Sequence, residues 1–298
     1  MDLISKKKLY FAISLIVLIP GLISLVLFGL RLSIDFSGGS VSEYRFKVSA
    51  NKEDVIQVVK DSDAGFESIQ SSGNNSYIIK TKPITNTKND EIKKKMQEKF
   101  EGSVQESFET VGPSVGKETT VNAISSVAIA SLAILLYIAY SFRSIPKPYS
   151  SFRFGASAIV ALLHDAFVVL GVFSILGKTH GVEINSLFIT ALLTVIGFSV
   201  HDTIVVFDRI RENLSKLRGQ TFEQIVNFSL VETLSRSLKT SLTVVFTLFA
   251  MLVLGGESIR WFVFALLIGI VSGTFSSIFN AAPILVVWEN YEQSKKKK

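Results

Sequence analysis

Long apolar stretches alternate with charged segments along most of the chain. Six apolar runs are long enough to cross a bilayer, which takes roughly 17 to 25 residues per helix. They lie at 9–30, 121–142, 154–177, 184–207, 240–256 and 261–288. The fifth run is the shortest, so its helix can begin inside the segment that precedes it. This pattern predicts a polytopic α-helical membrane protein with six transmembrane helices.

Lysine and arginine are distributed unevenly between the segments that flank these runs. Of the 31 basic residues, 16 lie in the four segments 1–8, 143–153, 208–239 and 289–298. The two short loops on the opposite side carry only Lys178 and Arg260. Because cytoplasmic loops of membrane proteins are enriched in basic residues, this bias predicts that both termini are cytoplasmic. The net charge of +6 therefore reflects topology and gives no reason to expect a nucleic-acid partner.

The polar segment 31–120 is the one candidate for a soluble domain, and we divide the chain into 1–30, 31–120 and 121–298. Its pattern is strand, helix, strand, strand, helix, strand. The expected elements lie at 41–48, 51–61, 66–71, 77–81, 87–100 and 104–111. A Gly73-Asn74 turn joins the middle two strands. This βαββαβ order predicts a small extracytoplasmic α+β domain of the ferredoxin-like fold between the first and second helices.

The first apolar run and segment 221–236 each allow more than one interpretation. The first apolar run follows Lys6-Lys7-Lys8, as in a signal peptide, but it is too long and lacks a convincing cleavage site. We therefore expect a retained signal anchor. Segment 221–236 opens with Thr221 and Gln224, which resemble a capping box. Its apolar positions fit an amphipathic helix at the membrane surface and an ordinary connecting helix equally well.

Two carboxylates fall within apolar runs: Asp165 in the third and Asp202 in the fourth, each directly after a histidine. An ionisable group inside the membrane is costly and persists where it pairs or meets water. The helical rise of about 1.5 Å per residue places Asp165 on the order of 16 Å from the cytoplasmic end of its helix, and Asp202 on the order of 8 Å from its own. This stagger favours a proton relay. The alternative is that each aspartate is protonated and hydrogen-bonds a neighbouring helix.

Arg236, at the cytoplasmic start of the fifth run, is the obvious cation for Asp202. An arginine keeps its proton, but its approach or withdrawal can switch a carboxyl group between proton release and capture. His201 can extend the path, because histidine changes charge near physiological pH. It points about 100° around the helix from Asp202, however, so it can instead face a neighbouring helix.

Glycines mark close packing in the sixth run and a misleading motif after the third. Gly269, Gly273 and Ser277 recur at four-residue spacing, which permits close helix approach. Gly177-Lys178-Thr179 ends like a nucleotide-binding loop, but its spacing from Gly171 is wrong and it leaves the membrane on the outer side. We therefore expect no ATPase, no catalytic residue, no metal and no cofactor.

Four segments resemble a single protein family. Residues 197–213, G-F-S-V-H-D-T-I-V-V-F-D-R-I-R-E-N, resemble the signature of the SecF subunits of the bacterial Sec protein translocase, members of the SecD/SecF family. The resemblance extends to V-G-P-S-V-G-K-E at 111–118 and to L-S-R-S-L-K-T-S at 234–241. It also includes D-F-S-G-G, in which Asp35, Gly38 and Gly39 predict a tight structural turn. Together these segments cover essentially the whole chain.

The resemblance implies a multi-pass subunit of the bacterial cell (inner) membrane whose membrane domain is similar to half of an RND-type transporter. Such a subunit acts with a SecD-like partner, the Sec translocon channel and the translocating preprotein, and uses the proton-motive force to promote export. In the family, the Asp of an N-D-T motif and the Arg of an S-R-S segment belong to the proton pathway. They map to Asp202 and Arg236, while His201 replaces the family's usual Asn and Asp165 is a further candidate. The choice between H⁺ and Na⁺ stays open.

Two other functions compete with this hypothesis. A freestanding RND-like exporter half would carry small molecules, but transporter folds of this kind usually have two repeats and this chain has one. An intramembrane aspartyl protease would use Asp165 and Asp202, which would have to lie close enough to share a proton. The expected difference in depth between them, and the absence of a G-x-G-D sequence, argue against a protease.

Overall fold

The computed structural model describes residues 1–72, 75–143, 145–146, 148–217 and 219–296. Its contacts divide the chain into two compact units, Met1–Arg31 with Ser125–Lys298 and Leu32–Ile124. We call the first the membrane unit and the second the sheet unit. Each is described by itself.

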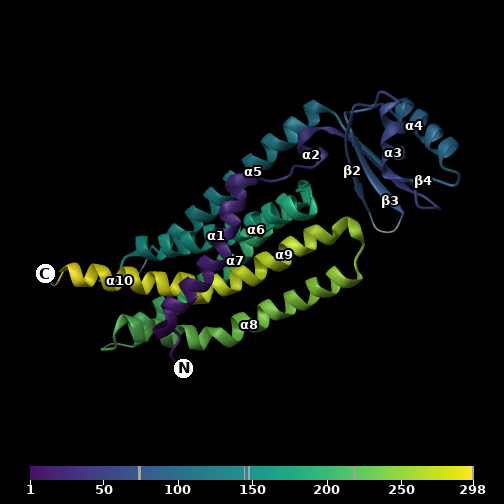
Figure 1. Ribbon diagram of the computed structural model, residues 1–298. Coiled ribbons are helices and arrows are strands. Elements are labelled where there is room, and N and C mark those ends of the chain that lie inside the picture. The colour runs from purple at the N-terminus through teal and green to yellow at the C-terminus, as the bar shows by residue number, and fades with distance from the viewer. Residues whose placement is uncertain (73–74, 144, 147, 218, 297–298) are drawn as a thin grey trace. The chain divides into compact units, whose positions relative to one another are not determined.

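Six helices in the described part of the chain are long and apolar enough to cross a membrane, which confirms the predicted number of spans. In chain order they are η1 and α1 (Ile4–Lys6, Lys7–Phe28), α5 (Pro113–Ser141), α6 (Ser151–His180), α7 (Ser186–Lys216) and α8 (Phe222–Leu254), followed by the sixth, which comprises α9 (Glu257–Ser276), the π-helical η2 (Ser277–Ala281) and α10 (Ala282–Lys296). Figure 1 shows them as long rods, with α10 continuing α9.

Several helices run beyond the apolar stretches that predicted them. α7 continues through the charged segment as far as Lys216, and α8 extends without a break from Phe222 to Leu254. The capping box at the start of α8 is present, because Thr221 and Gln224 each bond the other's backbone N–H. No Gly or Pro interrupts residues 222–254, so nothing in the sequence ends the helix between its polar and apolar halves. Residues 222–236 therefore form the first half of the same helix that carries the fifth apolar run, and not a separate helix.

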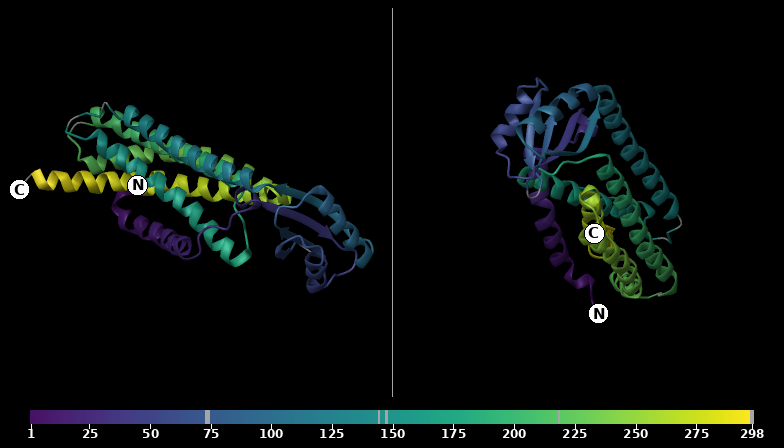
Figure 2. Two further views of the ribbon diagram at one scale, coloured as in Figure 1. Left: turned by 90° about the horizontal axis from the view of Figure 1, so that it is seen from above. Right: turned by 90° about the vertical axis from the view of Figure 1, so that its right-hand side faces the viewer.

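The core of the membrane unit is formed by α6, α7 and α9, which pack against one another, with α1 against α6 and α8 against α7 and α9 (Figures 1 and 2). Glycines allow the closest approaches. A Cβ atom on Gly171 of α6 would lie 2.6 Å from the Cα of Gly21 on α1. On α9, a Cβ atom on Gly273 would lie 3.0 Å from the Cβ of Ser199 on α7. The predicted small-residue face of the sixth span is thus confirmed as a helix contact.

Helix α5 differs from the other long helices in its exposure. Most of its side chains between residues 121 and 141 are exposed, and Ile138 is the buried exception. After the helix, Phe142 is buried against the rings of Phe154 on α6 and Phe207 on α7. This end of α5 is therefore anchored to the bundle while most of its length offers an apolar surface.

The sheet unit contains a four-stranded sheet with helices packed on it. Its elements are α2 (Ile34–Ser37), β1 (Gly39–Arg45), α3 (Lys52–Lys60), β2 (Phe66–Ser71), β3 (Ser76–Thr81), α4 (Asn86–Lys99) and β4 (Val104–Val111). The strand order is β2-β3-β1-β4 and all neighbouring strands are antiparallel. The core brings together side chains of α3, α4 and the strands, including Tyr44, Val55, Ile79 and Met96.

The predicted elements of this unit are present, with small shifts of their ends. β1 ends at Arg45 instead of residue 48, because the chain leaves the sheet there to reach Asn51, whose side chain caps α3. The Gly73-Asn74 turn lies outside the described residues. The turn at Gly38 and Gly39 is confirmed: their φ angles are +72° and +135°, values that residues with a side chain rarely adopt.

Candidate functional site

Asp165 is enclosed by hydrogen-bond donors in the centre of the membrane unit. Its carboxylate is 1% exposed and accepts hydrogen bonds from Ser199 of α7 at 2.6 Å and from Ser272 and Ser276 of α9 at 2.7 and 2.5 Å. His164, its neighbour on α6, places Nδ1 3.1 Å from Oδ1. We call these three serines and His164 the Asp165 cage. They stabilise a buried carboxylate by replacing the water that it loses.

Asp202 is also buried, but its surroundings are poorer in donors. The side chain is 3% exposed, and the hydroxyl of Ser241 on α8 lies 3.4 Å from Oδ2. Thr274 of α9 donates to Ser241 at 2.7 Å and so extends this contact to a third helix. Because a bond of 3.4 Å is long for a hydroxyl donor, the Asp202 carboxylate is only weakly satisfied by the described residues.

Small polar side chains occupy the contact between α7 and the sixth span. Thr203 and Ser277 approach to 2.9 Å, and Ser277 also donates to the carbonyl of Ser199. Ser277 opens the π-helical segment η2, whose wider turn interrupts the regular hydrogen bonding of the helix. Asn280 in the same segment accepts a hydrogen bond from Ser14 of α1 at 2.8 Å. A ladder of hydroxyl groups therefore runs along α9 and η2 beside both aspartates.

The structure does not bring all the predicted site residues together. Arg236 is exposed on α8, and no hydrogen bond or ion pair joins it to Asp202 among the described residues. His201 is exposed on α7, one position before the buried Asp202. The charge switch between Arg236 and Asp202 and the role of His201 therefore stay predictions.

The serines of the Asp165 cage are not among the site residues that the sequence pattern predicts. Ser272 and Ser276 are four residues apart and so share one face of α9, a signal that was available in the sequence. Ser199 lies within the 197–213 segment, where nothing in the pattern distinguishes it as a site residue. Which of many serines in apolar helices faces a carboxylate depends on helix rotation, which spacing alone does not fix.

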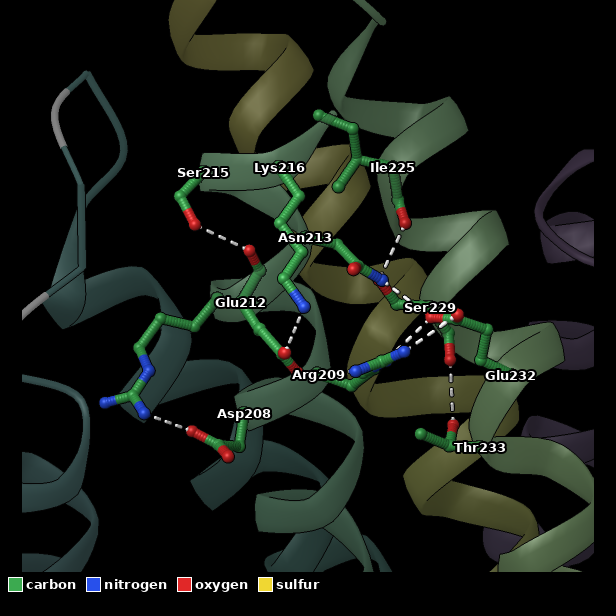
Figure 3. Close-up of polar contacts among 11 residues, drawn as sticks. Asp208, Arg209, Glu212, Asn213, Ser215, Lys216, Ile225, Ser229, Glu232 and Thr233 are labelled. Carbon is green, nitrogen blue, oxygen red and sulfur yellow. Dashed lines mark hydrogen bonds and ion pairs between the residues drawn. The ribbon is translucent and has the colours of Figure 1, made fainter. Parts of the chain in front are cut away.

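A second polar cluster joins α7 to α8 where the two helices carry charged residues (Figure 3). Arg209 donates to both carboxylate oxygens of Glu232, at 2.7 and 2.8 Å, and to Glu212 at 2.5 Å. Asn213 donates to Ser229 and to Glu232, each at 2.9 Å. The bidentate contact fixes the register of α7 against α8, which are the helices that carry Asp202 and Arg236.

A buried ion pair joins the start of α6 to α10. It was not predicted from the sequence. Arg153 donates to both oxygens of Glu289 at 2.7 and 3.1 Å, and the Glu289 side chain is 2% exposed. Burial, and after it the charge of Glu289, raises the pKa of Tyr149 in the preceding connection. The Arg153–Glu289 pair therefore has a structural role, and it shares no residue with the Asp165 cage.

The D-F-S-G-G segment has the compact geometry expected of a structural motif. Ser33 caps α2 through the backbone N–H of Asp35. A Cβ atom on Gly116 of α5 would lie 2.8 Å from the backbone nitrogen of Gly38, so the segment packs directly on the start of α5. Among the described residues there is no group of three or more His, Cys, Asp or Glu side chains suited to a metal ion.

Fold and site together define a multi-pass membrane protein whose central helices enclose two aspartates among hydroxyl groups. Two family descriptions match the chain: "Protein export membrane protein SecD/SecF, C-terminal" over residues 91–291, and "SecD/SecF GG Motif" over residues 23–50. The second match includes the D-F-S-G-G segment. The chain belongs to the SecD/SecF family, as its resemblance predicted, and is a transport component and not an enzyme.

Relatives and solved structures show two arrangements of this family. The protein translocase subunit SecF of Thermobaculum terrenum is 50% identical, and the match covers 97% of this chain and 94% of that protein. The SecDF subunit of Bacillus subtilis is 37% identical over 99% of this chain but only 39% of its own length. The crystal structure of SecDF from Thermus thermophilus matches with a TM-score of 0.84 and 31% identity, over 97% of this chain and 39% of that one. The chain thus spans about two fifths of each fused SecDF protein.

Proposed function

We propose that this protein is an auxiliary subunit of the Sec translocase that acts with a SecD-like subunit and uses the proton-motive force to promote preprotein export. The observation that carries the proposal is the pair of buried aspartates on α6 and α7, with 1% and 3% exposure, in a chain of the SecD/SecF family. Buried ionisable groups in membrane helices are costly and usually mark an ion pathway.

Asp202 is the central station of the proposed pathway. Among the described residues it has one hydrogen bond, from Ser241, and this bond is long, so the charge of Asp202 depends on what else approaches it. Arg236 lies on α8 five residues before Ser241, and its movement toward Asp202 would stabilise the carboxylate. Asp165 is the second station, and His201 extends the path from the exposed face of α7.

The proposed topology places both termini in the cytoplasm and the sheet unit outside the bacterial cell membrane. It rests on the basic residues that flank the spans on one side. The proposed domains are 1–30, 31–120 and 121–298, and the middle one is ferredoxin-like. The βαββαβ order with strand order β2-β3-β1-β4 supports that fold.

The proposed partners are a SecD-like subunit, the translocon channel and the preprotein, within the lipid bilayer. SecD and SecF are joined in one chain in Bacillus subtilis SecDF, which supports a partner of that kind for a chain that covers 39% of it. The exposed apolar length of α5 supports a neighbouring helix supplied by another subunit.

The proposal is tested by Asp202→Asn in the full chain together with its SecD-like partner. The amide keeps the shape and one acceptor of the side chain but cannot release a proton. Asp208→Asn is the matched control, because Asp208 is an exposed aspartate on the same helix. We expect gradient-dependent secretion to fall to the level seen with a protonophore in Asp202→Asn and to stay normal in Asp208→Asn. Normal secretion in Asp202→Asn, with the complex intact, would contradict the proposal.

A further inference from the structure

His164 holds the one buried histidine nitrogen that lacks a hydrogen-bond partner among the described residues. Its Nδ1 lies 3.1 Å from Asp165, whereas its Nε2 is buried and unpaired. The side chain as a whole is 12% exposed. An imidazole whose Nδ1 is hydrogen-bonded and whose Nε2 has no partner can take up a proton at Nε2.

The Asp165 cage determines which nitrogen of His164 carries a proton. Ser199, Ser272 and Ser276 all donate to the Asp165 carboxylate, so both of its oxygens act as acceptors. His164 completes the cage as a donor through Nδ1. A neutral imidazole has one N–H, so Nε2 is left with a free lone pair.

Two surface depressions reach His164 from the side of α1. One, of about 510 Å³, lies between α1, α6 and α9 and includes Ser14 and Ser272. The other, of about 470 Å³, lies between α1, α6 and the sixth span and includes Ser14 and Asn280. Each holds three polar side chains in an otherwise apolar lining, and a bound water needs two to four polar partners. His164 is the one titratable side chain that lines either depression, and Asp165 stands directly behind it.

We propose that His164 is a proton-carrying residue that forms a single proton-binding unit with Asp165 and takes up protons at Nε2. In uptake, a new N–H bond forms at Nε2 while an O–H bond of a hydronium ion breaks and leaves water. The product is an imidazolium next to a carboxylate. Its net charge is zero, so the loaded unit is better suited to the membrane than the bare carboxylate. Release returns the Nε2 proton to water or passes the Nδ1 proton to Asp165.

The position of the ring protons gives a test that does not depend on transport. The chain has 3 histidines, so ¹⁵N-histidine labelling of the full protein in lipid vesicles yields few signals, and His164→Gln identifies those of His164. We expect the neutral ring to carry its proton on Nδ1 and acidification to add one at Nε2. In Asp165→Asn the preference for Nδ1 should disappear. A neutral ring protonated on Nε2, or a ring that never changes charge with pH, would overturn the proposal.

The transport test rests on the proposed proton-driven function and separates the two ideas. Glutamine at position 164 can still donate to Asp165 but cannot carry a proton, and His164→Asn is a second variant in case the first folds poorly. We expect gradient-dependent secretion to fall about tenfold or more, as for loss of a proton-transfer group. His180→Gln, at the exposed end of α6, should secrete normally. Normal secretion in His164→Gln with loss in Asp202→Asn overturns only the role of His164, whereas normal secretion in Asp202→Asn overturns the proposed function itself.

Discussion

Asp165 and Asp202 are two buried carboxylates on neighbouring helices with very different surroundings. Asp165 accepts from three serines and faces His164, all within 3.1 Å. Among the residues that the structure describes, Asp202 has one hydroxyl contact, at 3.4 Å. Their exposure is nearly the same, 1% and 3%, so burial alone does not distinguish them. What differs is how much of the lost hydration each protein environment replaces.

The difference assigns different physical roles to the two sites. A carboxylate held by fixed donors on two other helices contributes to the packing of α6, α7 and α9 and changes its surroundings only if those helices move. A carboxylate with one long bond responds to whatever cation or water approaches it. Asp165 is thus suited to hold charge at a fixed place, and Asp202 is suited to be switched.

Alanine substitutions of the two aspartates should give the largest difference in stability between the two sites. Asp165→Ala leaves three serine hydroxyls and His164 without their acceptor, and we expect it to lower the free energy of unfolding by about 2 to 4 kcal/mol. Asp202→Ala removes one long contact and should cost no more than about 1 kcal/mol. Unfolding of the full chain in mixed micelles by a denaturing detergent measures both. Equal losses in the two variants would show that the cage does not stabilise the bundle.

Helix packing offers a second, smaller test of the cage. A Cβ atom on Gly273 would meet Ser199 at 3.0 Å, so Gly273→Ala should displace the serine that donates to Asp165. We expect a loss of about 1 to 2 kcal/mol. The loss should shrink in an Asp165→Ala background, because both changes act on one contact. Gly197→Ala on α7 is the control: nothing lies within 4 Å of its added Cβ, and its stability should not fall.

The sequence predicted the spans and both aspartates because these depend on local signals. Membrane-length apolar runs and a carboxylate inside one are visible without any tertiary contact. The strands of the sheet unit were predicted for the same reason: each alternates and ends at turn-forming residues. β4 at Val104–Val111 agrees residue for residue.

What the sequence could not predict are contacts that depend on the rotation of one helix against another. The three serines of the Asp165 cage lie 34 to 111 positions from Asp165 in the chain, and Arg153 and Glu289 are 136 apart. The π-helical segment at Ser277–Ala281 changes the face that each later residue presents. An ideal helical period therefore fails to place Asn280 beside Ser14.

The charged cluster in Figure 3 provides a test of how α7, which carries Asp202, is held against α8. Arg209→Lys replaces a bidentate contact with Glu232 by a single one, and we expect a loss of about 0.5 to 1 kcal/mol because the pair is partly exposed. Arg211→Lys, whose partner Asp208 is exposed, should have no measurable effect. Secretion should fall in Arg209→Lys only, since in the proposed charge switch the register of α7 and α8 sets how Arg236 approaches Asp202. Equal secretion by both variants would show that this register is not important.

A solvent-exposed carboxylate gives the smallest expected effect and the control for all the others. In α4, hydrogen bonds from Lys88 and Lys95 lower the pKa of Glu91 from 4.5 to about 2. Because the folded pKa is the lower one, this interaction stabilises α4 at pH values above 4.5 and is lost as the pH falls toward 2. Amide hydrogen exchange of α4 in the full chain should show slightly faster exchange for Glu91→Gln near neutral pH and no difference at the acid end.

Salt separates this exposed carboxylate from the buried ones. At about 1 M salt the screening length falls to about 3 Å, so the difference between Glu91→Gln and the wild type should vanish. The loss in Asp165→Ala should persist under the same conditions, because the Asp165 side chain is 1% exposed and accepts short hydrogen bonds. If salt instead removes the Asp165 effect, solvent ions reach the cage. Fixed donors would then not be what distinguishes Asp165 from Asp202.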